Sequence, residues 1–257
     1  ISVLRRMSLA VEGHDKHIQN KCTVCPLAKQ IRLPFILSCT RRSKMFDMIH
    51  LDVWGPYKTA THNGFRYFLT LVDDYSRMTW LYLIRLKSDV VTVLKNFISM
   101  IITQFAFTVK IFRSDNGSEF FNNECKVLFE STGTIHQSSC PHTPQQNGVV
   151  ERKHRHLLEV CRALLFHSKL PTRFWGECLL IATFLINRFP SKLLDMKTPY
   201  KLLFGHCPDY SLLRCFGCLC YASNLPIHRG KLDPKSVKCV FLGYPFRKKV
   251  SRPEPTP

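Results

Sequence analysis

Three acidic residues, Asp52, Asp115 and Glu151, stand where the sequence could build a site for metal ions. The first two are separated by 62 residues (53–114) and the last two by 35 residues (116–150). Carboxylate oxygens are preferred ligands of Mg²⁺, and two such ions about 3.5–4 Å apart can hold both the attacking and the leaving oxygen of a phosphoryl transfer. The trio therefore predicts a catalytic site in which the three carboxylates bind two Mg²⁺ or Mn²⁺ ions.

Each acid taken alone also has an ordinary structural explanation. Surface carboxylates are commonly solvated, and Glu151 would be favourable near a helix N-terminus without any catalytic role. Three neighbouring acids could be confused with the trio. Asp73 and Asp74 suit a turn between two strands, and Glu119 is interpreted as a supporting or exposed residue. Only the joint spacing and the flanking residues single out the catalytic trio.

The elements that must position these acids can be read from the hydrophobic pattern. Alternation of apolar and polar residues predicts strands, and apolar residues three and four positions apart predict helices. Strands are expected at 49–53, 67–72, 79–85, 109–113 and 135–138, and helices at 88–105, 123–131, 149–167 and 174–187. This order fits an α/β fold with a mixed five-stranded sheet and helices on both faces. Ser88 is expected to cap the first helix.

In this arrangement Asp52 lies inside the first strand and Asp115 directly follows the fourth. Glu151 lies in the first turn of the helix after a loop at 140–148, which is rich in proline, glutamine and asparagine. All three acids therefore fall at one edge of the sheet. Three short β-like runs, at 216–218, 219–222 and 238–242, indicate a small C-terminal β-barrel.

The charge of the chain points to a polyanionic partner. Lys and Arg together number 37 against 18 for Asp and Glu, which gives a formal net charge of +19. The basic residues are dispersed and do not form one amphipathic stripe, so nucleic acid is favoured over an anionic membrane. No run of about 18 apolar residues is present, and a membrane-spanning segment is not expected. DNA is the expected partner, and no membrane partner is expected.

Four residues near Glu151 are candidate DNA contacts. Gln146 and Asn147 precede it in the loop, and Lys153 and Arg155 follow it on the helix. Arg155 is four residues from Glu151, so it could pair with that carboxylate or reach a phosphate. The alternatives are ordinary loop composition for the first pair and a solvated basic helix face for the second.

Twelve cysteines raise the question of disulfides or zinc. No secretory signal is visible, so free thiols in a reducing compartment are expected. Cys22 and Cys25 have the spacing of a zinc ligand pair, but the nearest upstream histidines, His14 and His17, leave only four residues (18–21) before Cys22. That is short for two ligand pairs. Zinc binding is therefore not expected, and surface or core thiols are the alternative.

Four segments resemble one known family. They are LDVWGP at 51–56, VDDYSR at 72–77, SDNGSEF at 114–120 and PQQNGVVER at 144–152. Together they are similar to the integrase region of copia-type long-terminal-repeat retrotransposon Gag-Pol polyproteins. The resemblance implies a ribonuclease H-like catalytic core with Asp52, Asp115 and Glu151 as metal ligands.

The resemblance also implies an organisation along the chain. Residues 1–42 would be a partial pre-integrase segment with a zinc-module remnant, 43–168 the catalytic core and 169–206 a helical extension. Residues 207–250 would form an SH3-like barrel, and 251–257 a tail. The chain begins at Ile1 without an initiator methionine, which suggests a piece of a longer polyprotein.

The expected function is that of an integrase, a Mg²⁺-dependent DNA strand transferase that joins 3′-hydroxyl ends to host DNA. We expect it to act as a homo-oligomer in the nucleus after synthesis in the cytoplasm, although no targeting signal is identified. A ribonuclease H or other nuclease is a second enzymatic hypothesis, which the QQNG loop before Glu151 disfavours. A truncated or domesticated nucleic-acid-binding relic without catalysis is a third.

Overall fold

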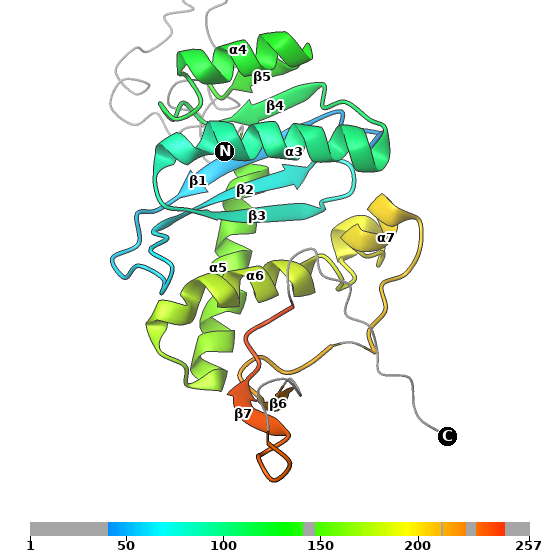
Figure 1. The fold of residues 1–257 in the computed structure, drawn as a ribbon. Helices are drawn as coiled ribbons and strands as arrows, with labels where there is room; N and C mark the ends of the chain where they lie inside the picture. The colour runs from blue at the N-terminus through cyan, green and yellow to red at the C-terminus, as the bar shows by residue number, and fades with distance from the viewer. Residues whose placement is uncertain (1–40, 141–146, 212, 225–229, 245–257) are drawn as a thin grey trace, which may run out of the picture. The chain divides into compact units, whose positions relative to one another are not determined.

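The computed structural model describes residues 41–140, 147–211, 213–224 and 230–244. A five-stranded sheet has the strand order β3-β2-β1-β4-β5 (Figure 1). Its strands are β1 (Ile49–Trp54), β2 (Tyr67–Asp73), β3 (Thr79–Ile84), β4 (Ile111–Ser114) and β5 (Ile135–Ser138). The α-helices are α3 (Val90–Phe105), α4 (Asn123–Thr132), α5 (Gly148–Ser168), α6 (Trp175–Ile186) and α7 (Pro199–Phe204). Within the described residues there are also short 3-10 helices, η1 (Lys87–Asp89), η3 (Thr172–Phe174) and η4 (Lys192–Leu194).

The sheet is mixed, as the sequence predicted. β1 pairs antiparallel with β2, and β2 pairs antiparallel with β3. β1 and β4 are parallel, and so are β4 and β5. The parallel half follows from the helical crossovers α3 and α4, because parallel neighbours need a long connection whereas antiparallel ones can use a tight turn. β4 and β5 therefore end at the same edge of the sheet.

Helices cover both faces of this sheet (Figure 1). Leu69 and Leu71 of β2 pack with α3 and α4 in one apolar cluster. Phe68 of the same strand and Leu81 of β3 pack with α5 and α6 in another. The division follows from the geometry of a strand, in which successive side chains point to opposite faces. Asp52 pairs in register with Thr70, which directly precedes Leu71 and shares the face of Phe68. Asp52 therefore faces α5.

The helical extension predicted for 169–206 packs into the same core as the sheet. Trp175, Cys178 and Leu179 of α6 are buried in the cluster that contains Phe68. At the end of this helix, Asn187 accepts a hydrogen bond from the Thr79 amide at 2.9 Å and donates one to the Thr79 carbonyl at 2.7 Å. These two bonds join the extension to the edge strand β3.

The start of the first long helix differs from the expectation that Ser88 caps it. Ser88 lies within η1, and α3 begins at Val90. The carboxylate of Asp89 instead accepts hydrogen bonds from the backbone amides of Arg85 and Leu86, at 3.1 and 3.0 Å. An additional 3-10 turn therefore precedes the helix.

The C-terminal part of the described chain holds a two-stranded antiparallel sheet of β6 (Leu219–Ser223) and β7 (Ser236–Val240). Two of the three predicted β-like runs are thus strands. The third, at 216–218, forms a turn in which the Cys218 amide donates to the Cys215 carbonyl at 3.2 Å. Gly217, with a φ of 79°, adopts the left-handed conformation there, which glycine accepts without steric cost.

Among the described helices, none has the length and apolar character needed to cross a lipid bilayer. Cys22, Cys25 and the rest of the predicted pre-integrase segment up to residue 40 lie outside the described residues, and so does the tail at 251–257.

Candidate functional site

The parallel pairing of β1 with β4 brings two of the predicted acids to neighbouring positions. The register pairs Ile49 with Phe112 and His50 with Arg113. Asp52 lies two residues after His50, and Asp115 lies two residues after Arg113, so the two acids are at corresponding positions. The sequence predicted these acids at one edge of the sheet, and the structure adds that their two strands are neighbours.

The acids surround Asp52 with negative charge. Burial, the charge of Asp115 and the charges of Glu151 and Glu119 raise the pKa of Asp52 to about 7, against a partial opposing effect of a hydrogen bond from the Val53 amide. Like charges raise the pKa of a carboxyl group because they disfavour its ionised form. Asp115, Glu151 and Glu119 thus all act electrostatically on Asp52.

Glu119 belongs to this acidic cluster because its carboxylate and that of Asp115 both lie close to Gly117. Gly117 lies between them, and a side-chain carbon there would stand 2.8 Å from Glu119 Oε2 and 3.0 Å from Asp115 Oδ1. The Gly117 amide donates a hydrogen bond to Asp115 Oδ1 at 3.0 Å. Glu119 is only 8% exposed, and Lys87 Nζ pairs with its Oε1 at 3.0 Å. The interpretation of Glu119 as a supporting residue is therefore favoured over that of an exposed one.

Glu151 lies in the first turn of α5, as the sequence predicted, and its side chain is exposed. The start of this helix is held on β1, because Asn147 Nδ2 donates to the Leu51 carbonyl at 3.3 Å. Among the described residues, no group of three His, Cys, Asp or Glu side chains is placed to hold one metal ion. The carboxylates therefore share a region of the molecule without converging on a single point.

The chemistry of the donors nevertheless fits a hard divalent cation. The group consists of carboxylate oxygens, which Mg²⁺ prefers. Glu119 Oε2 is buried and has no hydrogen-bond partner in the described part of the chain, and the glycine at 117 leaves space beside it. A buried carboxylate oxygen without a partner is costly. A cation bound near Asp115 would offset both this cost and the repulsion on Asp52.

His154 contacts Asp52 from α5. Its Nδ1 lies 3.5 Å from Asp52 Oδ2, its ring packs edge-on against Phe68, and its Nε2 is buried without a partner among the described residues. Burial lowers the pKa of His154 to about 4, so the ring is neutral near pH 7. His154 was not among the site residues predicted from the sequence. Its position three residues after Glu151 on the same helix was the available signal.

The predicted DNA contacts fall in different environments. Arg155 is exposed, and the described residues contain no ion pair between it and Glu151. Lys153 is half-buried, and burial, followed by the charge of Arg77, lowers its pKa to about 8.

The two loop candidates have different outcomes. Asn147 is 1% exposed and bonded to the backbone of β1, so in this conformation it holds α5 in place and its side chain does not reach the surface. This corrects the expectation of a surface contact at Asn147. Gln146 lies outside the described residues.

Asp73 and Asp74 have the structural role that their position in a turn suggested. Asp73 Oδ2 accepts hydrogen bonds from the amide and the hydroxyl of Ser76, both at 2.7 Å. Asp74 Oδ1 lies 3.0 Å from His50 Nε2 and 3.0 Å from Arg77 Nη1. Burial alone would raise the pKa of Asp74, but the hydrogen bonds from His50 and the Arg42 amide and the charge of Arg77 outweigh it and lower the pKa to about 2.

Comparison with known proteins identifies two matching families along the chain. Residues 42–144 match the integrase core domain, and residues 218–252 match the retroviral polymerase SH3-like domain. The second match covers β6 and β7.

Longer relatives match almost the whole chain. It is 38% identical over 243 residues to the retrovirus-related Pol polyprotein from transposon RE1 of Arabidopsis thaliana, which covers 95% of this chain and 16% of that polyprotein. The corresponding Pol polyprotein from transposon TNT 1-94 of Nicotiana tabacum is 37% identical over 242 residues, covering 90% of this chain and 18% of the relative. The chain thus spans less than a fifth of the length of these relatives.

One solved structure, the catalytic core domain of BIV integrase, is similar with a TM-score of 0.47 and 23% identity. The similarity covers 62% of this chain and 95% of that one.

Proposed function

Because the chain carries the integrase core domain of copia-type retrotransposon Pol polyproteins, we propose that it joins the 3′-hydroxyl ends of retrotransposon DNA to host DNA by two-metal phosphoryl transfer. The observation that supports this most directly is the cluster around Asp52. Asp115 follows the neighbouring parallel strand, and burial together with the charges of Asp115 and Glu151 raises the pKa of Asp52 to about 7. Asp52, Asp115 and Glu151 are the proposed ligands.

The proposed reaction is a direct transesterification. The donor 3′-oxygen forms a new bond to a target phosphorus, while the bond between that phosphorus and the target 3′-oxygen breaks. The proton of the donor hydroxyl is lost to solvent, and the displaced 3′-oxygen gains one. Bound divalent ions supply acidification of the attacking hydroxyl and stabilisation of the leaving oxygen.

The protein residues would hold this arrangement rigidly. His154 limits the orientations of the Asp52 carboxylate from the side of α5. Asn147 fixes the beginning of the helix that bears Glu151 to the strand that bears Asp52. Lys87 neutralises one oxygen of Glu119, which leaves the other available on the side of Asp115. Placement of charged groups before the reaction is the main way in which such sites lower a barrier.

The proposed partner is DNA. The net charge of +19 favours phosphate contacts, and Arg155 is exposed on the helix that carries Glu151. Lys153, half-buried beside it, would add positive charge. We further propose that the protein acts as a homo-oligomer in the nucleus, where both DNA substrates would meet.

Asp115→Asn tests the proposal. The variant keeps the size of the side chain and removes the charge that a metal ligand needs. Strand transfer, measured with labelled donor and target DNA in Mg²⁺ or Mn²⁺, should fall by about a thousandfold or more. Asp195→Asn is the matched control, because Asp195 is exposed in a turn outside the sheet and its left-handed backbone suits asparagine.

Equal strand transfer by the parent and Asp115→Asn would contradict the mechanism. DNA binding without strand transfer in parent, variant and control alike would instead support the alternative of a nucleic-acid-binding relic.

A further inference from the structure

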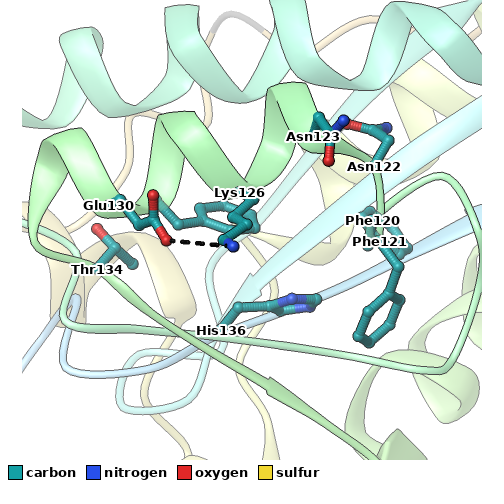
Figure 2. Close-up of a pocket in the computed structure, with 9 residues that line it drawn as sticks. Phe120, Phe121, Asn122, Asn123, Lys126, Glu130, Thr134 and His136 are labelled. Carbon is teal, nitrogen blue, oxygen red and sulfur yellow. Dashed lines mark ion pairs between the residues drawn. The ribbon is translucent and has the colours of Figure 1, made fainter.

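A cavity of about 320 Å³ lies between α4 and β5, which is an edge strand of the sheet (Figure 2). Its apolar wall includes Phe121, Phe129 and the ring of His136, and its polar wall includes Asn123, Lys126 and Glu130. The three polar residues follow one another along α4 at spacings of three and four, so they project from one helix face. The cavity thus has aromatic rings opposite a row of hydrogen-bonding groups.

The cavity lies close along the chain to Asp115, on the other face of the sheet from Asp52. His136 Nε2 lies 2.8 Å from the hydroxyl of Ser114, the residue that precedes Asp115. Phe120, Phe121 and Asn122, which follow Glu119 and lead into α4, also line the cavity. A ligand held in the cavity would therefore be near the end of β4, on the side of the sheet that α4 covers.

The aromatic wall offers open surface for another flat group. The Phe121 side chain is 54% exposed, although it is a large apolar residue. Its ring centroid lies 4.9 Å from that of His136, with the planes tilted by 45°, and the Phe129 centroid lies 5.1 Å from His136 on the buried side. Among the described residues, the hydrogen bond with Ser114 is the only one of the His136 ring.

The polar wall presents charges of both signs. Lys126 Nζ and Glu130 Oε1 are 3.9 Å apart, and the two side chains point toward each other in Figure 2. Both are largely exposed, so the pair is weak and either group can turn to a ligand. The carboxylate accepts hydrogen bonds from amino groups, whereas the ammonium attracts phosphate.

We propose that this cavity binds one unpaired DNA base near the end of β4, on the face of the sheet that α4 covers, a proposal that rests on the proposed function for the presence of DNA. The base would stack on Phe121 and His136, its amino group would donate to Glu130, and its phosphate would lie near Lys126. Aromatic side chains bind unpaired bases in this way because every base has a flat face. A volume near the lower end of the roughly 300–1,000 Å³ typical of ligand sites suits a single nucleotide and excludes a duplex.

Two competing occupants are less compatible with the walls of the cavity. A small anion on its own would be repelled by the Glu130 carboxylate. A purely apolar side chain of a protein partner would form no hydrogen bond or ion pair with Glu130 or Lys126. Unpaired DNA is consistent with both walls at once.

The test compares two probes of equal charge. One is a fluorescently labelled duplex with a two-nucleotide 5′ overhang of cytosines, and the other has the same overhang without bases. The parent should bind the first at least about fivefold more tightly, since stacking of one base contributes that much or more. In Phe121→Leu this ratio should fall close to one. Phe166→Leu is the matched control, because Phe166 is 78% exposed on α5 outside the cavity, and it should keep the ratio of the parent.

A second variant tests the polar wall. Glu130→Met keeps the length of the side chain and removes the acceptor, so a preference of about threefold for cytosine over thymine overhangs should be lost. Glu124→Met, on the same helix but outside the cavity lining, should keep it.

Equal binding of the two probes by the parent, or an unchanged ratio in Phe121→Leu with its helical content intact, would overturn the proposal. Displacement of the overhang probe by micromolar free dCMP would also overturn it, since the cavity would then be a mononucleotide site. Strand transfer with blunt DNA on the same preparations reports on the proposed function separately. Joining without discrimination between the probes would reject only the base site, and discrimination without joining would reject only the enzyme activity.

Discussion

The Nδ1 atom of His154 lies 3.5 Å from Oδ2 of Asp52, so helix α5 contacts the carboxylate in the middle of the central strand. The same helix carries Glu151 one turn earlier and begins directly after Asn147, which is bonded to the carbonyl of Leu51. The position of α5 on β1 therefore affects two of the three proposed ligands at once. His154 is interpreted as a positioning residue.

His154→Phe keeps a ring packed against Phe68 and removes the nitrogen that faces Asp52. We expect strand transfer to fall by about 10–100-fold, the usual effect of losing a residue that orients a metal ligand. The Mg²⁺ concentration for the half-maximal rate should rise, which a purely structural role would not cause. Rates over a Mg²⁺ titration, with the melting temperature measured in parallel, check this. Failure of His154→Asn to recover part of the rate would argue against positioning through a polar contact.

Gly117→Ala would place a methyl group between Asp115 and Glu119, at 3.0 Å from the first carboxylate and 2.8 Å from the second. Glu119 could yield only by moving from Lys87, with which it is paired at 3.0 Å in a buried position. We therefore expect loss of most strand transfer, by about tenfold or more, with the fold retained in circular dichroism.

Gly148→Ala is the control for this prediction. The added carbon would stand 2.9 Å from the end of the Arg152 side chain, which is exposed and free to turn away. Similar losses in both glycine variants would mean that the space beside Asp115 has no special importance.

Much of the core could be predicted from the sequence because its determinants are local. Alternating apolar residues located β1 and β2, and the helical spacing located α5 with Glu151 in its first turn. The order of the elements also predicted Asp52 and Asp115 at one edge of the sheet, whereas the pairing of β1 with β4 that makes them neighbours is a finding of the structure.

The residues that support the site could not be predicted in this way. Glu119 is buried because Lys87, 32 residues earlier in the chain, neutralises it, and no local pattern signals that pairing. Asn147 had the composition of a loop residue, but a contact with Leu51, 96 residues away, buries it. The sequence favoured Ser88 as the cap of the helix at 88–105. In the structure, the Asp89 carboxylate accepts hydrogen bonds from the amides of Arg85 and Leu86 and so determines the chain path before α3. Tertiary contacts decide such cases.

The ion pairs of Asp74 predict how stability changes in acid. Its pKa is about 2 in the folded protein against an ordinary value of 3.8. A carboxyl group with a lowered pKa stabilises the fold fully above its unfolded value and loses this effect as the pH falls through the folded value. The window is therefore between about pH 4 and pH 2, and the contribution above it is about 2 kcal/mol.

Asp74→Asn should accordingly lower the free energy of unfolding by about 2 kcal/mol at pH 7. The difference between parent and variant should shrink as the pH approaches 2. Urea unfolding at a series of pH values measures it, and the exposed Asp195→Asn serves as the comparison. A difference that stays constant down to pH 2 would show that charge on Asp74 is not its source.

The exposed position of Arg155 on α5, one turn after Glu151, leads to a prediction about DNA affinity. Each phosphate that a basic side chain neutralises releases counterions, so the logarithm of the affinity falls linearly with the logarithm of the salt concentration. Arg155→Ala should weaken binding of any DNA sequence and reduce that slope by about one unit. Lys192→Ala removes one exposed positive charge from η4, away from the sheet, and should leave the slope unchanged. Fluorescence anisotropy with one duplex at several salt concentrations gives both quantities. If the two variants changed the slope equally, the effect of Arg155 would reflect net charge alone, and the helix that bears Glu151 would not be part of the DNA-binding surface.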